Sequence, residues 1–445
     1  MRLRRCLLAA GFALAGFASR GLAAAPDTAP SLPDPLDLKS ALGFALGNNF
    51  TIRLARERIR QQEGVEIEVR ARQLPNVGAS GSYAGNAKEI STFVPAADNT
   101  WNIALQARQV LYAGGGVTAA ATGARLSREA ATFELEGVIN QQLLAARTQF
   151  YAVLLAKEKV AVQEENVKLL EQQLKDAKSR FDAGTTSNFD LLRAQVALAN
   201  GQPPLIQARN DHRIAFEQLR QVLGAGAGSN EGAAPTVVGS LEIGRPEDFQ
   251  LTDALSAAAA NRPELLRLAR LQGAGEQGVK ASRAGYLPEF DLVGGYVWTR
   301  GPFSGSWNNR LQGWTAGIQA QWNLFDGRAT AGRVRQARSQ LEQTKLSQAE
   351  TTLSVEVQVR QAYSTLVEAR ELVDASGKTV EQAQEALRIA NVRYGAGSAT
   401  QLDVLTSQVA LTQARLNQLE ALYGYHVALA ALRQAIGVAD EYVKS

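Results

Sequence analysis

The sequence predicts a mixed α and β membrane protein in which one helix–strand–strand–helix–helix unit occurs twice. The segment 180–192 recurs without a gap as segment 393–405, and the same offset of 213 residues joins landmarks along the whole unit. A register held over that length indicates a duplication. In each half, helical periodicity changes to two stretches of period two and then returns to one long helical run without proline.

Residues 1–24 have the pattern of a secretory signal peptide. Three arginines precede an apolar run over residues 6–17, and small residues follow this run. The run is too short to cross a bilayer as a permanent helix. Its Cys6 is the only cysteine of the chain, so disulfides and thiolate metal sites are not expected after cleavage.

Removal of the signal balances the charge of the chain. Four of the 47 lysines and arginines lie within it, which leaves 43 basic residues against 43 acidic residues. A nucleic-acid partner is therefore not expected, because such a partner requires a concentrated basic face. No apolar stretch long enough for a transmembrane helix follows the signal, so a route into a membrane would use strands that close into a barrel.

The sequence divides into two units with a linker between them. Residues 25–224 form the first unit, and residues 249–437 form the second. The stretch 225–248 is rich in Gly, Ala and Ser and is expected to link the units at mid-height. Residues 438–445 are expected to form a C-terminal tail.

In the first unit the elements can be assigned in order. Residues 26–36 are rich in Pro and Asp and predict an extended tail. A helical pattern then runs over residues 37–73 and stops at Pro75. Apolar and polar residues alternate beyond it, which predicts strands at about 76–86 and 100–111.

The strands of the second unit are expected at about 289–299 and 312–324. Their aromatic residues share one face, and polar residues occupy the other face. Soluble hairpins that pack on a core show similar alternation. Aromatic residues concentrated in the strands of an exported chain favour the girdle of an outer-membrane barrel instead. The residues expected in this girdle are Trp101, Trp298, Trp314 and Trp322.

A long helix is expected from about residue 113 to residue 181 and again in the second unit. Apolar residues seven positions apart in this helix are typical of coiled coils. Glycine-containing segments, 181–190 (the first tip) and 394–403 (the second tip), then reverse the chain. A return helix follows each tip, and Pro203-Pro204 is expected to interrupt and bend the first one.

The helix lengths indicate how the parts assemble. At a rise of 1.5 Å per residue the long helix spans roughly 100 Å, and the first helix and the return helix span roughly 54 Å each. Two short helices stacked end to end therefore match one long helix. A single chain offers four strands, too few to close a barrel around a lumen. Three copies around a cyclic axis would supply twelve strands.

This order of elements resembles the TolC family, the outer membrane factors of Gram-negative tripartite efflux pumps and type I secretion systems. The resemblance rests on the duplication, on the Asp-hydrophobic-Leu runs 190–192 and 403–405 after the tip glycines, and on the Asn-Arg-Pro-Glu-Leu run 261–265. It implies a homotrimer with a twelve-stranded barrel in the lipid of the Gram-negative outer membrane and a coiled-coil α-helical tunnel in the periplasm. It also implies a periplasmic adaptor and an inner-membrane transporter as partners.

The resemblance assigns an adaptor-docking role to the two tips. Gly184 and Gly397 match the docking positions of the family, and ordinary turn chemistry also requires glycine at such positions. Both explanations can hold together. The polar contacts expected nearby are Thr185, Ser187, Ser398 and Thr400.

The family pattern places Asp403 at the tunnel constriction, where three copies would form a ring that favours cations. Its counterpart Asp190 has the same position after the first tip, and a carboxylate there also suits the start of a helix. Ala399 and Thr406 stand where some members have an arginine and a further acid. An arginine-based lock of the closed tip is therefore not expected at residue 399, and Asp190 or Arg393 is expected to take part instead. Tyr394 is assigned to the constriction together with them.

Catalytic patterns are absent from the sequence. His212 and His426 are isolated, and no glycine-rich loop precedes a Lys-Ser or Lys-Thr pair. The run 114–116 of three glycines lies at a strand-to-helix junction, where it is expected to relieve crowding. The sequence therefore predicts a passive efflux duct, not an enzyme, without cofactor or metal. The alternatives are a channel for type I protein secretion and a structural or surface coiled-coil protein without transport.

Overall fold

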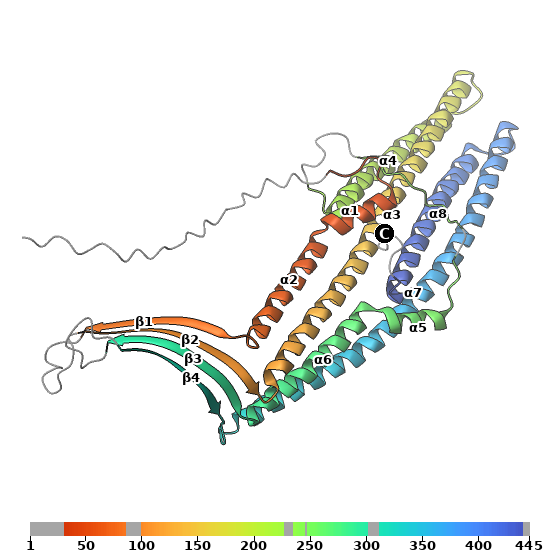
Figure 1. Ribbon diagram of the computed structural model, residues 1–445. Helices are drawn as coiled ribbons and strands as arrows, with labels where there is room; N and C mark the ends of the chain where they lie inside the picture. Colours follow the sequence, from red (N-terminus) through yellow and green to blue (C-terminus); the bar gives the residue numbers. More distant parts are fainter. Residues whose placement is uncertain (1–30, 86–98, 227–234, 245–246, 301–310, 439–445) are drawn as a thin grey trace, which may run out of the picture.

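The structure is a computed structural model that describes residues 31–85, 99–226, 235–244, 247–300 and 311–438. The chain is elongated and mostly helical. A four-stranded sheet lies at one end, and two long helical hairpins form the other end (Figure 1). Residues 1–30, which include the predicted signal, and the hairpin loops 86–98 and 301–310 lie outside the described ranges.

The order of elements confirms the duplication. The first unit contains α1 (Leu38–Asn48), α2 (Phe50–Ala71), β1 (Asn76–Gly85), β2 (Asn99–Ala113), α3 (Gly116–Asp182) and α4 (Asn188–Leu223). The second unit contains α5 (Leu251–Asn261), α6 (Pro263–Arg283), the short 3-10 helix η2 (Ala284–Tyr286), β3 (Glu289–Arg300), β4 (Leu311–Gln321), α7 (Ala329–Gly395) and α8 (Gln401–Ile436). Three helices of the second unit, α5, α7 and α8, begin and end 213 residues after α1, α3 and α4.

The single helix predicted over residues 37–73 is wrong, because two helices meet at Asn49. The Asn49 side chain accepts hydrogen bonds from the backbone N–H groups of Thr51 (2.8 Å) and Ile52 (3.1 Å), which caps α2. Its amide also donates to the carbonyl of Val222 at the end of α4, over 2.7 Å. In the second unit Arg262 occupies this position and donates to the carbonyl of Gln434 over 3.2 Å.

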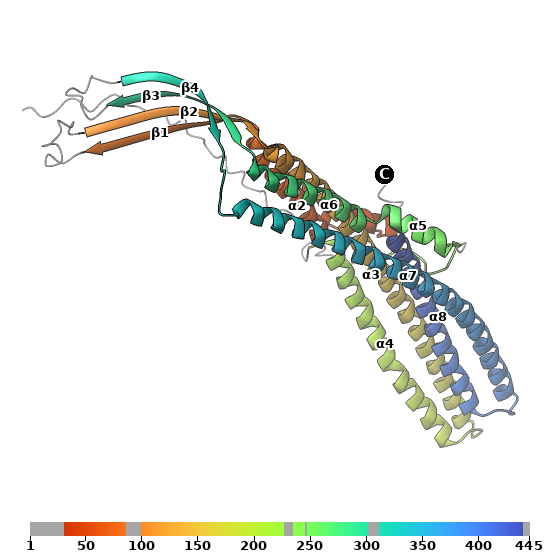
Figure 2. The same cartoon turned by 90° about the horizontal axis from the view of Figure 1, so that it is seen from below.

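The long helix α3 runs from the sheet to the first tip. Its 67 residues span roughly 100 Å at 1.5 Å per residue. Helix α2 packs on its half near the sheet, α4 packs on its half near the tip, and α1 contacts α4 where the two short helices meet. The predicted end-to-end stacking is therefore confirmed. In the tip half the helices lie in the order α4, α3, α8 and α7 (Figure 2).

The proline pair Pro203-Pro204 does not interrupt the return helix as predicted, because α4 continues through it. Each proline removes one backbone hydrogen bond to the carbonyl four residues earlier. Those carbonyls belong to Ala199 and Asn200, which are exposed, so water can solvate them. On the opposite side Gly201 is buried, and a Cβ at this position would lie 2.6 Å from a methyl group of Leu170 in α3. Close packing on α3 holds the helix together at this point.

A core at mid-height includes a segment that was predicted to be an extended tail. Leu36 is fully buried, and its N–H donates to the carbonyl of Thr236 over 3.0 Å. Leu36 also forms a parallel bridge with Val237 of the linker. Phe150 of α3 and Leu219 of α4 complete the centre of this core. The described part of the tail is therefore packed, because its leucine buries apolar area that would otherwise face water.

The four strands form one antiparallel sheet in the order β1-β2-β3-β4. The register aligns the predicted faces. Tyr83 pairs with Trp101, Leu105 with Tyr296, and Tyr296 with Trp314, so aromatic and aliphatic residues share one face. The other face is polar. Near its helical end Arg108 donates to Asp291 over 2.5 Å.

The last strand is shorter than predicted and ends at Gln321. Trp322 therefore lies outside the strand, and its indole N–H donates to the carbonyl of Tyr286 over 3.1 Å. This bond ties the chain after β4 to η2. The other three predicted girdle tryptophans lie within strands, and Trp314 is 76% exposed. None of the helices in the described ranges combines the length and the hydropathy of a membrane-spanning segment.

Candidate functional site

Both tip turns place a glycine in the left-handed region of backbone conformation. Gly184 has φ 72° and Gly397 has φ 73°. In the first tip, the N–H groups of Gly184 and Thr185 donate to the carbonyls of Phe181 and Arg180, each over 2.9 Å. These bonds satisfy carbonyls at the end of α3. A Cβ would meet no atom within 4 Å at either glycine, so the backbone of both turns is open to solvent.

Asp190 and Ser187 form the start of α4 after the first tip. The Ser187 hydroxyl donates to the Asp190 carboxylate over 2.7 Å and accepts from the Asp190 N–H over 3.2 Å. Thr186 donates to the same carboxylate oxygen over 3.1 Å. These hydroxyl bonds, with that of Ser187 the largest contribution, lower the pKa of Asp190 below its ordinary value. The carboxylate is therefore charged at neutral pH.

Asp403 has the equivalent role after the second tip, with a complete capping box. The N–H and hydroxyl of Thr400 donate to its carboxylate over 2.7 Å and 2.8 Å, and the Asp403 N–H points back to the Thr400 hydroxyl over 3.3 Å. The backbone N–H of Thr400 contributes most to a pKa of Asp403 below its ordinary value, followed by the hydroxyl. The carboxylate is exposed, so its second oxygen can face a neighbour or solvent.

The remaining predicted tip residues divide between the two hairpins. Arg180 places its guanidinium 4.6 Å from the ring centroid of Tyr394, which links the end of α3 to the end of α7. Arg393 donates instead to the carbonyl of Ser398 in its own turn over 3.4 Å. Among the described residues, no hydrogen bond joins Asp190 and Asp403, because two ionised carboxylates offer no donor; each accepts bonds from its own turn instead.

A buried polar seam between α3 and α8 was not predicted. Gln408 is 2% exposed; it accepts a hydrogen bond from Gln173 and donates to the side-chain oxygen of Asn166 over 3.1 Å. Thr412 donates to the same oxygen over 3.3 Å. The duplication gave a partial signal, because Gln195 stands at the equivalent position of the first unit. Gln195 is exposed, however, so the sequence alone does not show which copy is buried.

Two ion pairs flank this seam and join the same helices. Arg415 of α8 contacts Glu165 over 2.5 Å, and Lys159 of α3 contacts Glu420 over 2.8 Å. Both pairs are partly exposed, with the acidic side chains more than half exposed, so each contributes little stability alone. Together with the Gln408 seam they set the registry between the two hairpins of one chain.

His426 occupies a structural position, whereas His212 lies partly buried on α4. His426 stacks on Tyr151 with ring centroids 4.5 Å apart, and its Nε2 lies 3.1 Å from the carbonyl of Leu241. Burial lowers the pKa of His426 below its ordinary value. No group of three or more metal-ligating side chains comes together in the part of the chain that the structure describes.

The glycine run predicted to relieve crowding does so where the sheet meets the helices. A Cβ on Gly114 would lie 2.9 Å from that of Leu287, and one on Gly116 would lie 2.7 Å from that of Ala284. The strand-to-helix junction of β2 and α3 therefore packs on η2 through bare backbone.

The family model described as outer membrane efflux protein matches residues 41–225 and 254–438, which are the two structural units described above. The chain belongs to this family. TolC proteins are among the relatives that it matches, so the predicted resemblance is confirmed. Membership places this outer membrane efflux protein in the outer membrane.

Individual relatives are distant in sequence and close in fold. The chain is 26% identical to the outer membrane efflux protein BepC of Brucella suis, over 97% of this chain and 90% of BepC. It is 26% identical to the alkaline protease secretion protein AprF of Pseudomonas aeruginosa, over 68% of this chain and 63% of AprF. The solved CmeC outer membrane channel of Campylobacter jejuni superposes with a TM-score of 0.78 at 16% identity, covering 92% of this chain and 88% of CmeC.

Proposed function

We propose that this outer membrane efflux protein is the passive exit duct of a tripartite pump and acts as a homotrimer with a twelve-stranded barrel. The observation that supports the trimer is that, within the described residues, both the sheet and the helical layer of the single chain have edges without a neighbouring element. In the sheet, β1 and β4 each have one neighbour, so each leaves a row of backbone N–H and C=O groups unpaired within the chain. Such edges require a partner in a membrane.

The helical layer has an unpartnered edge at α7. Val355, Val359 and Leu366 of this helix are buried against the rest of the chain. At 3.6 residues per turn a second apolar stripe lies on the opposite side of the helix, and its residues are 62–65% exposed. This second stripe consists of Leu346, Leu353 and Val357.

The opposite edge of the layer is also apolar. In α2 the side chains of Phe50 and Leu54 are 63% and 65% exposed, whereas Ile52 is fully buried on the other side of the helix. In α4 the exposed apolar residues include Val196 and Ile214. A neighbouring copy that pairs its β1 with β4 would bring its α2 and α4 against α7. Sheet and helices would then close in one ring, and three copies supply enough strands for a lumen.

A cysteine pair tests the ring directly, because the only native cysteine lies in the predicted signal. Ser80→Cys in β1 with Thr315→Cys in β4 is expected to give covalent trimers with a flexible bismaleimide. The matched control is Ser82→Cys with Asn102→Cys, which are register partners within one chain. This control is expected to stay monomeric on a denaturing gel. Monomers from both pairs would contradict the closed ring.

The transporter and the adaptor that work with the duct decide which cargo it exports. We infer an inner-membrane transporter as the energy source and a periplasmic adaptor that delivers small molecules or ions to the tips. The open turns at Gly184 and Gly397 support docking, because bare backbone lets a helical hairpin approach closely. The name of AprF refers to protease secretion, which supports type I protein secretion as a second candidate. Crosslinking from the tips in cells, followed by mass spectrometry of the captured adaptor, distinguishes the two.

We further propose that Asp403 and, more weakly, Asp190 form charged rings at the constriction of the trimer. Both carboxylates have lowered pKa values and are therefore ionised at neutral pH. Three like charges around one axis attract cations more strongly than isolated surface charges do. Thr406 stands where some family members have a further acid. Its hydroxyl donates to the carbonyl of Leu402 in its own helix over 2.8 Å and is therefore not available to brace a closed tip.

A further inference from the structure

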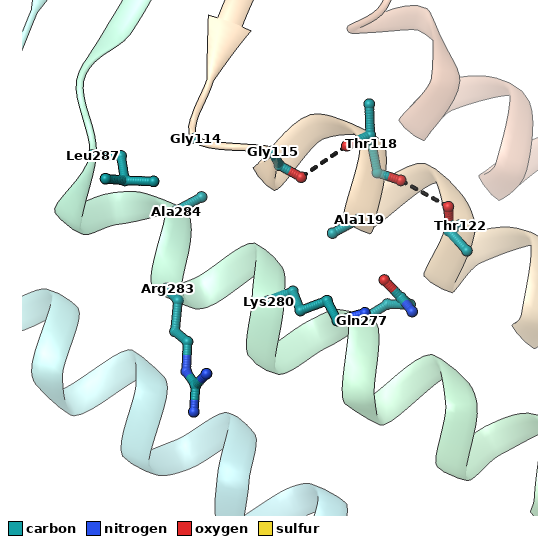
Figure 3. Close-up of a pocket in the computed structure, with 10 residues that line it drawn as sticks. All are labelled: Gly114, Gly115, Thr118, Ala119, Thr122, Gln277, Lys280, Arg283, Ala284 and Leu287. Atoms are coloured by element: carbon teal, nitrogen blue, oxygen red, sulfur yellow. Dashed lines mark hydrogen bonds between the residues drawn. The ribbon is translucent and has the colours of Figure 1, made fainter.

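We propose that the groove between the start of α3 and the end of α6 binds the phosphate headgroup of an anionic phospholipid from the periplasmic leaflet of the outer membrane. The proposal rests on the proposed barrel, whose apolar sheet face would contact lipid. The groove has a volume of about 390 Å³ (Figure 3). Its polar lining consists of Gly115, Thr118, Thr122, Gln277, Lys280 and Arg283.

In the proposed trimer, the groove opens on the outer side of the ring that the helices form. A second groove between the same helices, of about 500 Å³, is lined by Glu289 and Gln321. Glu289 and Gln321 are register partners at the helical end of the sheet. They share its polar face with Arg108, whose guanidinium lies 3.6 Å from the Glu289 carboxylate. The two grooves use different faces of α3, with Thr118 and Thr122 on one and Val117 and Ala120 on the other. The Lys280 groove therefore lies on the side of the apolar sheet face.

The groove carries positive charge without an acidic partner. None of its lining residues is acidic. Within the described residues Lys280 and Arg283 make no ion pair or side-chain hydrogen bond, whereas nearby Arg70 and Arg128 both pair with Glu66. Lys280 extends along the groove toward Gln277, and Arg283 leaves α6 in a different direction at the rim (Figure 3). Lys280 is thus the primary contact, and Arg283 adds a second charge.

Backbone groups on the facing helix favour the same ligand. The helix α3 begins after Gly115, which has φ 74° and offers no side-chain cap to the first-turn N–H groups. A Cβ at Gly115 would meet nothing within 4 Å, so this end of the helix is open at Gly115, whereas Gly114 and Gly116 on either side pack against Leu287 and Ala284. The hydroxyls of Thr118 and Thr122 donate to carbonyls of their own helix, each over 2.9 Å. Of residues 116–118 at the start of α3 only Thr118 lines this groove, and its uncapped N–H adds to the attraction that Lys280 exerts on a phosphate.

The surrounding surface selects a lipid over a free phosphate. Leu287 lines the groove, and Leu111, Tyr112 and Phe290 beside it at the helical end of the strands are 55%, 47% and 37% exposed. Tyr112 and Phe290 are register partners on the apolar face, with ring centroids 6.2 Å apart. A phospholipid can place its headgroup in the groove and its acyl chains along this face. A free phosphate gains only the polar half of these contacts.

Native mass spectrometry of the full protein tests the site with phosphatidylglycerol and phosphatidylcholine added in equal amounts. We expect the protein to retain phosphatidylglycerol preferentially, with up to three lipids per trimer. Lys280→Gln is expected to reduce this preference about fivefold, and Arg283→Gln to reduce it further. Lys280→Arg keeps the charge and should keep the preference. Lys378→Gln, an exposed lysine of α7 in the tip half, is the control and should change nothing.

Three outcomes overturn the inference. One is an equal preference in the wild type and the Lys280→Gln protein. Another is a wild type that binds both lipids equally. The third is displacement of the phosphatidylglycerol by millimolar inorganic phosphate, which would identify a free-phosphate site. The same spectra report the oligomeric state. A trimer without lipid preference contradicts the headgroup site alone, whereas a monomer contradicts the proposed duct.

Discussion

The helices α3 and α7 are copies of one another, yet their surroundings differ. Both have 67 residues, but 13 residues of α3 are buried and only 7 of α7. Leu154 of α3 is 2% exposed, and its counterpart Val367 is 37% exposed. The helix α3 lies between α2, α4, α6 and α8, whereas α7 lies at the edge of the layer. Burial in this protein is thus set by position in the helical layer, and the edge copy keeps an exposed apolar stripe that the proposed trimer would cover.

The largest expected effect comes from a charge on the unpartnered stripe of α7. Leu353→Glu should abolish the trimer, because a carboxylate would be buried without a partner at the interface between copies. Thr352→Glu adds the same charge at the adjacent exposed position, outside the stripe, and should leave the trimer intact. Size-exclusion chromatography with light scattering in detergent measures both. Trimers from both variants would show that this stripe is not the interface.

Matched truncations in the two copies sharpen the comparison. Leu154→Ala should lower the free energy of unfolding by about 2–5 kcal/mol, because it leaves a cavity in a packed core. Val367→Ala should cost about 0.5 kcal/mol if its side chain stays exposed in the assembly. Denaturant titration followed by circular dichroism gives both values. A Val367→Ala cost near that of Leu154→Ala would mean that a neighbouring copy buries Val367.

The tips test whether the two copies remain equivalent in function. Gly184→Leu or Gly397→Leu should strain the left-handed turn by about 1–2 kcal/mol and add a side chain where none is present. Both variants should form trimers and lose export in cells. Gly395→Leu is the control, because this glycine ends α7 with an ordinary φ and has open space around it. Normal export by both tip variants would exclude the turns as the adaptor contact.

Charge at the tips gives a smaller effect that depends on pH. Asp403→Ala should reduce the cation selectivity of the channel in planar bilayers, and Asp190→Ala should reduce it less. Unchanged selectivity and divalent block in the double variant would place the constriction elsewhere.

Because the pKa of Asp403 is lowered in the folded state, its capping contribution is fully present above the ordinary value of 3.8 and is lost as the pH falls below it. Thermal midpoints across pH 2–6 should show a smaller acid loss in Asp403→Ala than in the wild type, because Asp190 keeps its own lowered pKa in both.

The end of the first helix shows how far a duplicated sequence constrains structure. Asn49 and Arg262 occupy equivalent positions, and both tie a helix junction to a carbonyl near the end of a return helix. Asn49 makes this contact through its side-chain amide and Arg262 through its guanidinium, so two similar contacts share no residue type that a sequence comparison could recognise. The prediction of one continuous helix failed for this reason.

By itself the sequence determined the duplication, the order of helices and strands, the faces of the sheet and the glycines of the tips. These features depend on local periodicity and on backbone conformation, which each segment carries within itself. Only the tertiary structure decided that α4 continues through Pro203-Pro204, that Leu36 belongs to the core, and that Gln408 rather than Gln195 is buried. Each of these depends on the neighbour that packs against the segment, and contacts between segments distant in the chain leave little trace in local pattern.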